Sequence, residues 1–311
     1  KALPKKIKRL LQHPGGVWDL PELPDIGGPL EAYGAIEQSQ AEAAASFGVE
    51  HCWFGVNGAT GLLQAALLSI AKPGQAVLLP RNVHKCLINA CAIAGLRPIL
   101  FDLPFMKDRG HVISPDLSWL EKVLNVIASK GIKISAAVLV NPTYHGYSSD
   151  ISSLIKKLHG LEIPVLVDEA HGAHFLLTED EITPKSSLSA GADIVVHSLH
   201  KSSVGLTQTA VLWAQGSRID SLALARSIGW FQTSSPSTLL IASCEEAIRE
   251  LIKPREKNKL LLTIKRAKNL ANELRDIGLP ILINQDPLKL ILHTSSEGIT
   301  GFEADEWFIS R

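Results

Sequence analysis

The 311-residue sequence has no excess charge of either sign, since 31 acidic side chains balance 31 lysines and arginines. Proteins that bind a nucleic-acid backbone ordinarily carry a basic surplus or patch that the phosphates attract. We therefore expect no nucleic-acid partner.

Cysteines and long apolar runs are also scarce. The four cysteines (Cys52, Cys86, Cys91 and Cys244) include no C-x-x-C pair, and most lie in apolar surroundings. This predicts small buried thiols in a reducing compartment. No run approaches the ~20 apolar residues of a membrane helix, and no signal peptide opens the chain. We expect a soluble, cytoplasmic protein with no membrane partner.

Neither end of the chain has the features of a natural terminus. The sequence begins at Lys1 without methionine, and it stops at Arg311 directly after the helix-like stretch "FEADEWFISR". We therefore expect a fragment of a longer protein.

The stretch "DEAHGAHF" at 168–175 contains the letters that name a class of helicases. A nucleoside triphosphatase also needs a phosphate loop of the form G-x-x-x-x-G-K-[ST]. The sequence has no Gly-Lys dipeptide, so the helicase interpretation fails. A metal-site hydrolase is a remote alternative, with His171, His174 and Asp168 or Glu169 as zinc ligands. It leaves the lysine segment described below unexplained, and we expect no metal.

Apolar β-branched runs alternate with helical patterns over about 160 residues. Runs that are apolar throughout suit a sheet covered by helices on both faces, which predicts a doubly wound α/β fold. Ligands bind such sheets at the carboxyl ends of the strands. Polar residues follow the predicted strands there: Asn57, Asn141, Asp168 and Ser198. The predicted strands are Cys52–Val56, Ala76–Pro80, Pro98–Asp102, Ala136–Asn141, Pro164–Glu169, Asp193–Ser198 and Thr209–Ala214.

The pattern divides the chain into three parts. Residues 1–48 form an amino-terminal segment, and residues 49–254 contain all the predicted strands of the sheet. Residues 255–311 begin with a charged helix at 257–277, and two strand-like runs follow it at 281–283 and 289–293. We expect this last part to be the start of a smaller α+β domain.

The segment "HSLHKSSVGLTQTAVLWA" at 197–214 places Lys201 after an apolar strand. Lysine at an enclosed strand end is rare unless its amine has a partner or a task. One such task is a Schiff base with pyridoxal 5'-phosphate; the alternative is a surface lysine in a serine-rich loop. Asp168 ends another buried strand. An anion there would keep a cofactor's pyridine nitrogen protonated, although a helix cap or an ion pair is also possible.

The cofactor's phosphate needs donors, and "VNGATGLLQAALLSIA" at 56–71 provides a strand, a small-residue turn and a helix. Backbone N–H groups at Gly58, Ala59 and Thr60 would face an anion, helped by the helix dipole. Ser198 and His200 would supply further donors. In "PRNVHKCLINAC" at 80–91, His84 stands at a helix start. Its ring would either lie on a cofactor ring or cap the helix.

These segments together resemble the fold-type I pyridoxal-phosphate enzymes, and among them the ornithine/lysine/arginine decarboxylase family. The matching residues are "NGAT" at 57–60, "RNVHK" at 81–85, "NPTYHG" at 141–146, "DEAHGAHF" at 168–175 and "SLHKSSVGLTQTA" at 198–210. The resemblance implies a large domain with a mostly parallel seven-stranded sheet. It departs from the family pattern at His171, where many large bacterial members have tryptophan, and at Ala59 and Val204.

The resemblance also implies roles for individual residues. Lys201 would bind the cofactor covalently, Asp168 would pair with the pyridine nitrogen, and the ring would lie between His84 and Ala170. Ala59, Thr60, Ser198 and His200 would hold the phosphate, with His200 also near the reacting carbon. Thr143 and Tyr144 would line the substrate pocket. His171 would lie beside the cofactor's phenolic oxygen or the substrate carboxylate.

The implied reaction is decarboxylation of arginine, lysine or ornithine, with release of CO2 and a di- or polyamine. The same fold and cofactor also serve aminotransferases and carbon–carbon or carbon–sulfur lyases. Asp19 and Glu22 are candidates for binding the distal end of a basic substrate. By analogy with fold-type I enzymes, we expect a homodimer or higher homo-oligomer with the site at the subunit interface.

Overall fold

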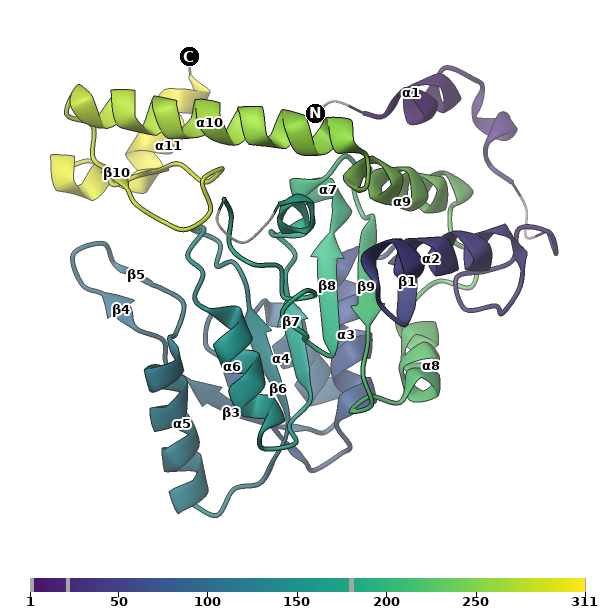
Figure 1. Cartoon of the computed structure of the whole chain (residues 1–311), viewed down its shortest axis with the longest axis horizontal. Coiled ribbons are helices and arrows are strands. Elements are labelled where there is room, and N and C mark those ends of the chain that lie inside the picture. The colour runs from purple at the N-terminus through teal and green to yellow at the C-terminus, as the bar shows by residue number, and fades with distance from the viewer. Residues whose placement is uncertain (1–2, 21–22, 179–181, 311) are drawn as a thin grey trace.

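The computed structural model describes residues 3–20, 23–178 and 182–310, and a seven-stranded sheet forms its centre (Figure 1). The strands are β1 (His51–Gly55), β2 (Ala76–Pro80), β3 (Arg97–Phe101), β6 (Ile134–Val140), β7 (Val165–Asp168), β8 (Ile194–Ser198) and β9 (Ala210–Ala214). Their order across the sheet is β1-β9-β8-β7-β6-β2-β3. The five strands from β8 to β3 are parallel, and β9 runs antiparallel to both of its neighbours. All seven predicted strands are confirmed.

Successive side chains of a strand point to opposite faces of the sheet, and both faces are buried. Val165 and Val167 of β7 belong to one apolar cluster, whereas Leu166 between them belongs to the other. Fully burying one such side chain stabilises the fold by roughly 2 kcal/mol. The first cluster is covered by α2 (Gly34–Phe47), α5 (Leu117–Ser129), α6 (Ile151–His159) and α9 (Thr238–Leu251). The second is covered by α3 (Gly58–Ile70), α4 (Lys85–Ile93) and α8 (Ser221–Phe231). The predicted two-faced α/β arrangement is confirmed.

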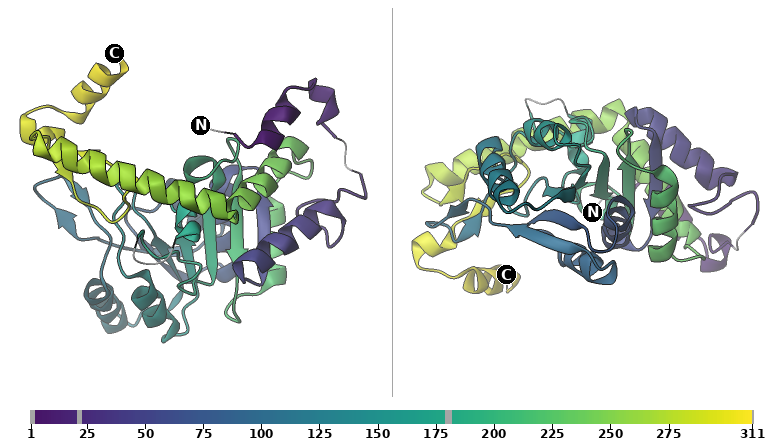
Figure 2. Two further views of the ribbon diagram at one scale, coloured as in Figure 1. Left: turned by 45° about the horizontal axis from the view of Figure 1, so that its top comes forward. Right: turned by 90° about the horizontal axis from the view of Figure 1, so that it is seen from below.

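A long helix, α10 (Pro254–Asp276), crosses above the carboxyl ends of the parallel strands (Figures 1 and 2). It begins three residues before the predicted helix because Pro254 suits a first helical turn. After it come β10 (Ile281–Leu282) and β11 (Ile291–Leu292), which pair antiparallel near the two predicted runs. The remaining elements are α1 (Lys5–Leu11), η1 (Gly15–Val17), β4 (Phe105–Met106), β5 (His111–Val112), η2 (Ala173–Leu177), α7 (Leu199–Ser202), η3 (Thr294–Glu297) and α11 (Gly301–Ile309).

All four cysteines are free and buried, as the sequence predicts. Burial raises the pKa of the Cys86 and Cys244 thiols to about 12, so both remain protonated and act as small apolar side chains. Within the described ranges, none of the helices combines the length and the apolar character needed to cross a membrane.

Candidate active site

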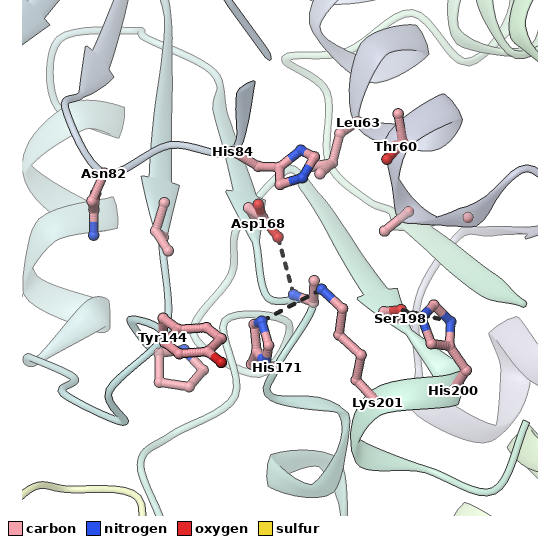
Figure 3. A pocket seen from close by; sticks show the side chains of 15 residues that line it. Thr60, Leu63, Asn82, His84, Tyr144, Asp168, His171, Ser198, His200 and Lys201 are labelled. Atoms are coloured by element: carbon pink, nitrogen blue, oxygen red, sulfur yellow. Dashed lines mark hydrogen bonds between the residues drawn. The ribbon is translucent and has the colours of Figure 1, made fainter. Parts of the chain in front are cut away.

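A cavity of about 350 Å³ opens where β6, β7 and β8 end (Figure 3). The alternation of the strands determines which side chains reach it. Val140, Asp168 and Ser198 share the sheet face that carries α3 and α4, and all three line the cavity. The complete lining is Gly58, Ala59, Thr60, Leu63, Asn82, His84, Val140, Pro142, Tyr144, Asp168, Ala170, His171, Ser198, His200 and Lys201.

Lys201 reaches the cavity from α7, the short helix that follows β8. It lies beyond the strand end, so its side chain is exposed at the mouth of the cavity. The prediction of an enclosed lysine is therefore wrong. Its Nζ is 3.4 Å from Nε2 of His171. A lysine amine can only donate when charged, so His171 accepts through Nε2 and carries its proton on Nδ1. Burial, and then the nearby Lys201 and Lys289 cations, lower the pKa of His171 to about 4, which keeps the ring neutral.

Asp168 lies at the carboxyl end of β7 and is only 7% exposed. Its Oδ1 accepts a hydrogen bond from the N–H of Ala170 at 3.1 Å. Burial raises the pKa of the Asp168 carboxyl, whereas the Ala170 hydrogen bond and the Lys201 amine act in the opposite direction. A buried carboxylate with so little compensation is stabilised by a cation placed against it. A protonated heterocyclic nitrogen is a ligand of this kind.

His84 caps a helix, as one of the two interpretations of the sequence predicts. It is the N-cap of α4, where its Nδ1 accepts a hydrogen bond from the N–H of Cys86 at 3.3 Å. The same ring lines the cavity and lies near Asp168 (Figure 3). Capping fixes the orientation of the imidazole, so a flat ligand bound over Asp168 would meet a pre-positioned ring. Ala170, which also lines the cavity, is small enough to let such a ligand approach.

The amino-terminal end of α3 supplies donors for an anion. Asn57 occupies the N-cap position, but its side chain does not cap the helix and donates instead to the carbonyl of Phe231 at 2.8 Å. The N–H of Gly58 is also engaged, because it donates to the carbonyl of Gln208 at 2.8 Å. The Gly58 N–H is therefore engaged within the chain and does not face an anion, although Gly58 itself lines the cavity. The N–H groups of Ala59 and Thr60 and the Thr60 hydroxyl remain at the cavity wall.

Ser198 and His200 form the wall facing this helix end (Figure 3). The Ser198 hydroxyl lies 3.0 Å from Nδ1 of His200, which is also 3.3 Å from the carbonyl of Thr209. These contacts place His200 on the anion side of the cavity. The imidazole in contact with the Lys201 amine is that of His171, which the sequence did not link to this lysine.

Thr143 departs from its predicted place. It is buried in its own turn, where Oγ1 accepts from the N–H of Tyr147 at 3.0 Å, and it is not among the lining residues. Tyr144 does line the cavity, and its ring meets His171 edge-on with centroids 5.6 Å apart. Of the residues predicted for the substrate's distal end, Asp19 is exposed and does not line the cavity, and Glu22 lies outside the described residues.

Four lining residues escaped prediction: Leu63, Asn82, Val140 and Pro142. Asn82 had a signal, since it stands in the "RNVHK" segment beside His84. Val140 had one too, because it ends β6, and the alternation of the strand points it to the face that carries Asp168.

The two histidines of "DEAHGAHF" have separate partners, which contradicts the zinc-site alternative. His171 contacts Lys201, whereas Nε2 of His174 lies 3.1 Å from Oδ1 of Asp286, a residue 112 positions further along. Among the residues that the structure describes, no group of three or more histidine, cysteine, aspartate or glutamate side chains is arranged to hold a metal ion.

Glu169 points to the opposite face of the strand end and is completely buried. Its Oε1 accepts from Asn141 Nδ2 at 2.9 Å and from the N–H and hydroxyl of Ser187 at 2.9 and 2.6 Å. Its Oε2 accepts from the Ser186 hydroxyl at 3.0 Å and from Nε2 of His197 at 2.7 Å. These bonds join the ends of β6, β7 and β8 beneath the cavity.

Trp213 completes this buried network. Its indole N–H donates to Nδ1 of His197 at 2.9 Å, so the histidine is neutral and its remaining proton, on Nε2, donates to Glu169. The orientation of the imidazole is therefore fixed at both nitrogens.

The sequence of this chain matches a known protein family and is similar to known enzymes. The family described as "Orn/Lys/Arg decarboxylase, major domain" matches residues 18–303. An arginine decarboxylase of Bacillus anthracis is 32% identical over 286 residues, which are 88% of this chain and 56% of the relative. The lysine decarboxylase LdcA of Pseudomonas aeruginosa is 27% identical over 242 residues, covering 72% of this chain and 32% of the relative.

A solved structure shares the fold. Lysine decarboxylase A from Pseudomonas aeruginosa superposes with a TM-score of 0.73 at 21% identity, over 82% of this chain and 36% of that one. The architecture is that of the fold-type I pyridoxal-phosphate enzymes, which confirms the predicted fold class. The chain spans a little over half the length of the arginine decarboxylase it matches.

Proposed function

The chain belongs to the Orn/Lys/Arg decarboxylase family, and from this membership we propose that it forms the cofactor-binding part of a pyridoxal-phosphate-dependent decarboxylase of a basic amino acid. The observation that carries the proposal is the pairing of a buried carboxylate, Asp168, with the amine of Lys201 at one cavity. Arginine is the first substrate to test, because the arginine decarboxylase relative is more similar than the lysine decarboxylase relative.

The residues present fit the cofactor. The under-compensated carboxylate of Asp168 suits a pyridine nitrogen that carries a proton. The α3 end, left uncapped by Asn57, suits a phosphate held by the N–H groups of Ala59 and Thr60. Ser198 and His200 would contact the same phosphate, and His84 and Ala170 would enclose the ring. Lys201 would attach the cofactor covalently.

When bound, pyridoxal phosphate supplies an electron sink for the electrons of the bond to the lost carboxylate. The chain's own residues supply orientation and proton handling. Asp168 would hold a proton at the ring nitrogen, and the fixed His84 ring would restrict tilting. Neutral His171 accepts a hydrogen bond from the Lys201 amine and so helps to orient it. Tyr144 would help to exclude water from the mouth.

The proposal also covers the domain organisation, the location and the oligomeric state of the protein. We assign cofactor binding to residues 49–254 and treat residues 1–48 and 255–311 as an amino-terminal segment and the start of a smaller domain. We also propose a cytoplasmic homodimer or higher homo-oligomer. Four buried thiols are compatible with a reducing compartment. Leu222 and Trp230 of α8 are 74% and 73% exposed, and a second subunit would cover such side chains.

The test is CO2 release from arginine, lysine and ornithine, measured in parallel on the whole cofactor-loaded protein. The proposal predicts CO2 and the matching amine from one of the three. Conversion to a keto acid without CO2 would assign an aminotransferase. Loaded protein that releases CO2 from none of them would overturn the proposal.

A further inference from the structure

A segment distant in sequence braces one side of the cavity. Residues 284–289 follow β10 and lie against the turn at 143–148, which carries Tyr144. The Asn284 side chain donates to the carbonyl of His145 at 2.8 Å, and the N–H of Asp286 donates to the carbonyl of Gly146 at 2.9 Å. In return, the N–H of Ser148 donates to Oε1 of Gln285 at 3.1 Å. Three hydrogen bonds thus fix the turn from outside the sheet.

Gly146 makes this close approach possible. Its φ is +79°, a conformation that favours glycine. A Cβ at this position would lie 2.8 Å from Cβ of Lys289 and 2.9 Å from Nδ2 of Asn284, closer than atoms pack. The side chains of Lys289 and Asn284 therefore pack directly against the Gly146 backbone, where no larger residue would fit.

Asp286 connects the brace to a second cavity wall. The residue is fully buried, and its Oδ1 accepts from Nε2 of His174 and from the N–H of Leu288, both at 3.1 Å. His174 is 4% exposed and lies in η2, three residues after His171. A single buried carboxylate thus joins the Tyr144 turn, through its own backbone, to the His171 segment, through its side chain.

The two braced side chains meet at the reacting amine. Tyr144 packs edge-on against His171, and His171 contacts Nζ of Lys201 at 3.4 Å (Figure 3). Lys289, from the bracing segment, places its Nζ 5.6 Å from the centre of the Tyr144 ring. The opposite wall, with Thr60 and Ser198, makes none of the bracing contacts described above. The brace therefore acts on the Lys201 side of the cavity and not on the anion side.

We propose that Asp286 is a positioning residue for the reaction, holding His171 and Tyr144 in place beside the Lys201 amine. The proposal rests on the proposed function for its kinetic consequence, but the positioning itself is a property of the protein without substrate. It assigns a task to a carboxylate that lies 85 residues beyond Lys201 (286 − 201) and does not line the cavity.

The first test uses hydrogen–deuterium exchange on the cofactor-free protein. In Asp286→Ala, peptides covering 171–175 should exchange at least about tenfold faster, because local opening no longer breaks the His174 bond. Peptides covering 143–148 keep the backbone bond from residue 286 to Gly146, so their exchange should rise by less. Asp286→Asn keeps an oxygen that accepts from His174 and Leu288, so it should stay near the wild type. Asp276→Ala removes an exposed aspartate at the end of α10 and is the matched control. Unchanged exchange in Asp286→Ala would overturn the proposal.

The second test is kinetic, on the whole cofactor-loaded protein. Asp286→Ala should lower kcat by about ten- to a hundredfold, the range for a reacting group misplaced by about 1 Å. Cofactor affinity should change by less than about threefold, since the anion side is not braced. Equal loss of cofactor binding and activity would assign a purely structural role and would contradict the proposal.

A double-mutant cycle separates positioning from general weakening. If Asp286 acts through His171, then Asp286→Ala should have little further effect on kcat in a His171→Ala background. Independent, multiplying effects would overturn the proposal. If the wild type releases CO2 from none of the three amino acids, the proposed function fails, while the exchange experiment still decides the positioning claim.

Discussion

Two neighbouring carboxylates at the end of β7 point to opposite faces of the sheet and differ in their number of hydrogen-bond partners. Asp168 faces the cavity and accepts one hydrogen bond, from Ala170, in the described part of the chain. Glu169, the next residue, faces the opposite side and accepts five. Both are almost completely buried. Glu169, with all its partners, serves the fold, whereas Asp168, which faces the cavity and is short of partners, is prepared for a ligand.

The largest expected effect on stability comes from a substitution at Glu169, the carboxylate that accepts five hydrogen bonds. Glu169→Gln replaces an acceptor of five donors with an amide whose own N–H group meets those donors. Removing one partner of a buried charged network costs about 3–5 kcal/mol. We expect the free energy of unfolding to fall by about that amount, measured by urea denaturation of the cofactor-free protein. Glu121→Gln, in a partly exposed pair with Lys157, is the control and should cost no more than ~1 kcal/mol.

A substitution at Asp168, the carboxylate with few partners, should lower activity and leave stability unharmed. Asp168→Asn keeps the shape but cannot stabilise a charged ring nitrogen, so kcat should fall by at least about a hundredfold. The fold should not be weakened, because a buried carboxylate with little compensation is removed. Steady-state rates and urea denaturation of the same preparation test both halves. If Asp168→Asn unfolds more easily than the wild type, the expected difference between Asp168 and Glu169 is contradicted.

A smaller effect is expected at the edge of the buried network. Trp213→Phe removes the N–H that donates to Nδ1 of His197 and leaves that nitrogen without its donor. Such a loss costs roughly 1–3 kcal/mol. The free energy of unfolding should fall by this amount, while cofactor affinity should stay close to that of the wild type. A loss of cofactor binding larger than the loss of stability would show that the two faces are not separable.

The smallest expected effect is the change with pH in the stability difference between Asp168→Asn and the wild type. Burial raises the pKa of Asp168, so on acidification the folded state takes up a proton at a higher pH than the unfolded state. This group therefore stabilises the fold at low pH, and its contribution is lost as the pH rises through the folded-state pKa. Cofactor-free Asp168→Asn should thus be more stable than the wild type at pH 7. The difference should shrink as the pH falls towards 4, as denaturation at several pH values can show.

The sequence was sufficient for the fold and for the cavity side of this contrast. Strands such as β7 are apolar up to their last residue, Asp168, and Lys201 follows β8 closely in the sequence. Thr143 was predicted in the pocket because it belongs to a matching segment, but which side chain of a turn points inward depends on the hydrogen bonds of that turn.

The buried side and the brace could not be predicted. The structural role of Glu169 was not predicted, because its partners Asn141 and Ser187 lie 28 and 18 residues away and nothing local marks them as neighbours. Asp286 meets His174 across 112 residues, in a part of the chain outside the matching segments. Such contacts depend on how distant elements pack, and no short-range pattern encodes them.

The most direct test of the account is to locate the cofactor on the chain. The whole protein is loaded with pyridoxal phosphate, reduced with borohydride, digested and mapped by mass spectrometry. The account predicts one modified peptide, with the cofactor on Lys201, and no stable adduct in Lys201→Ala. Stoichiometric attachment to another lysine, such as Lys85 or Lys289, or failure of the wild type to retain the cofactor, would contradict it.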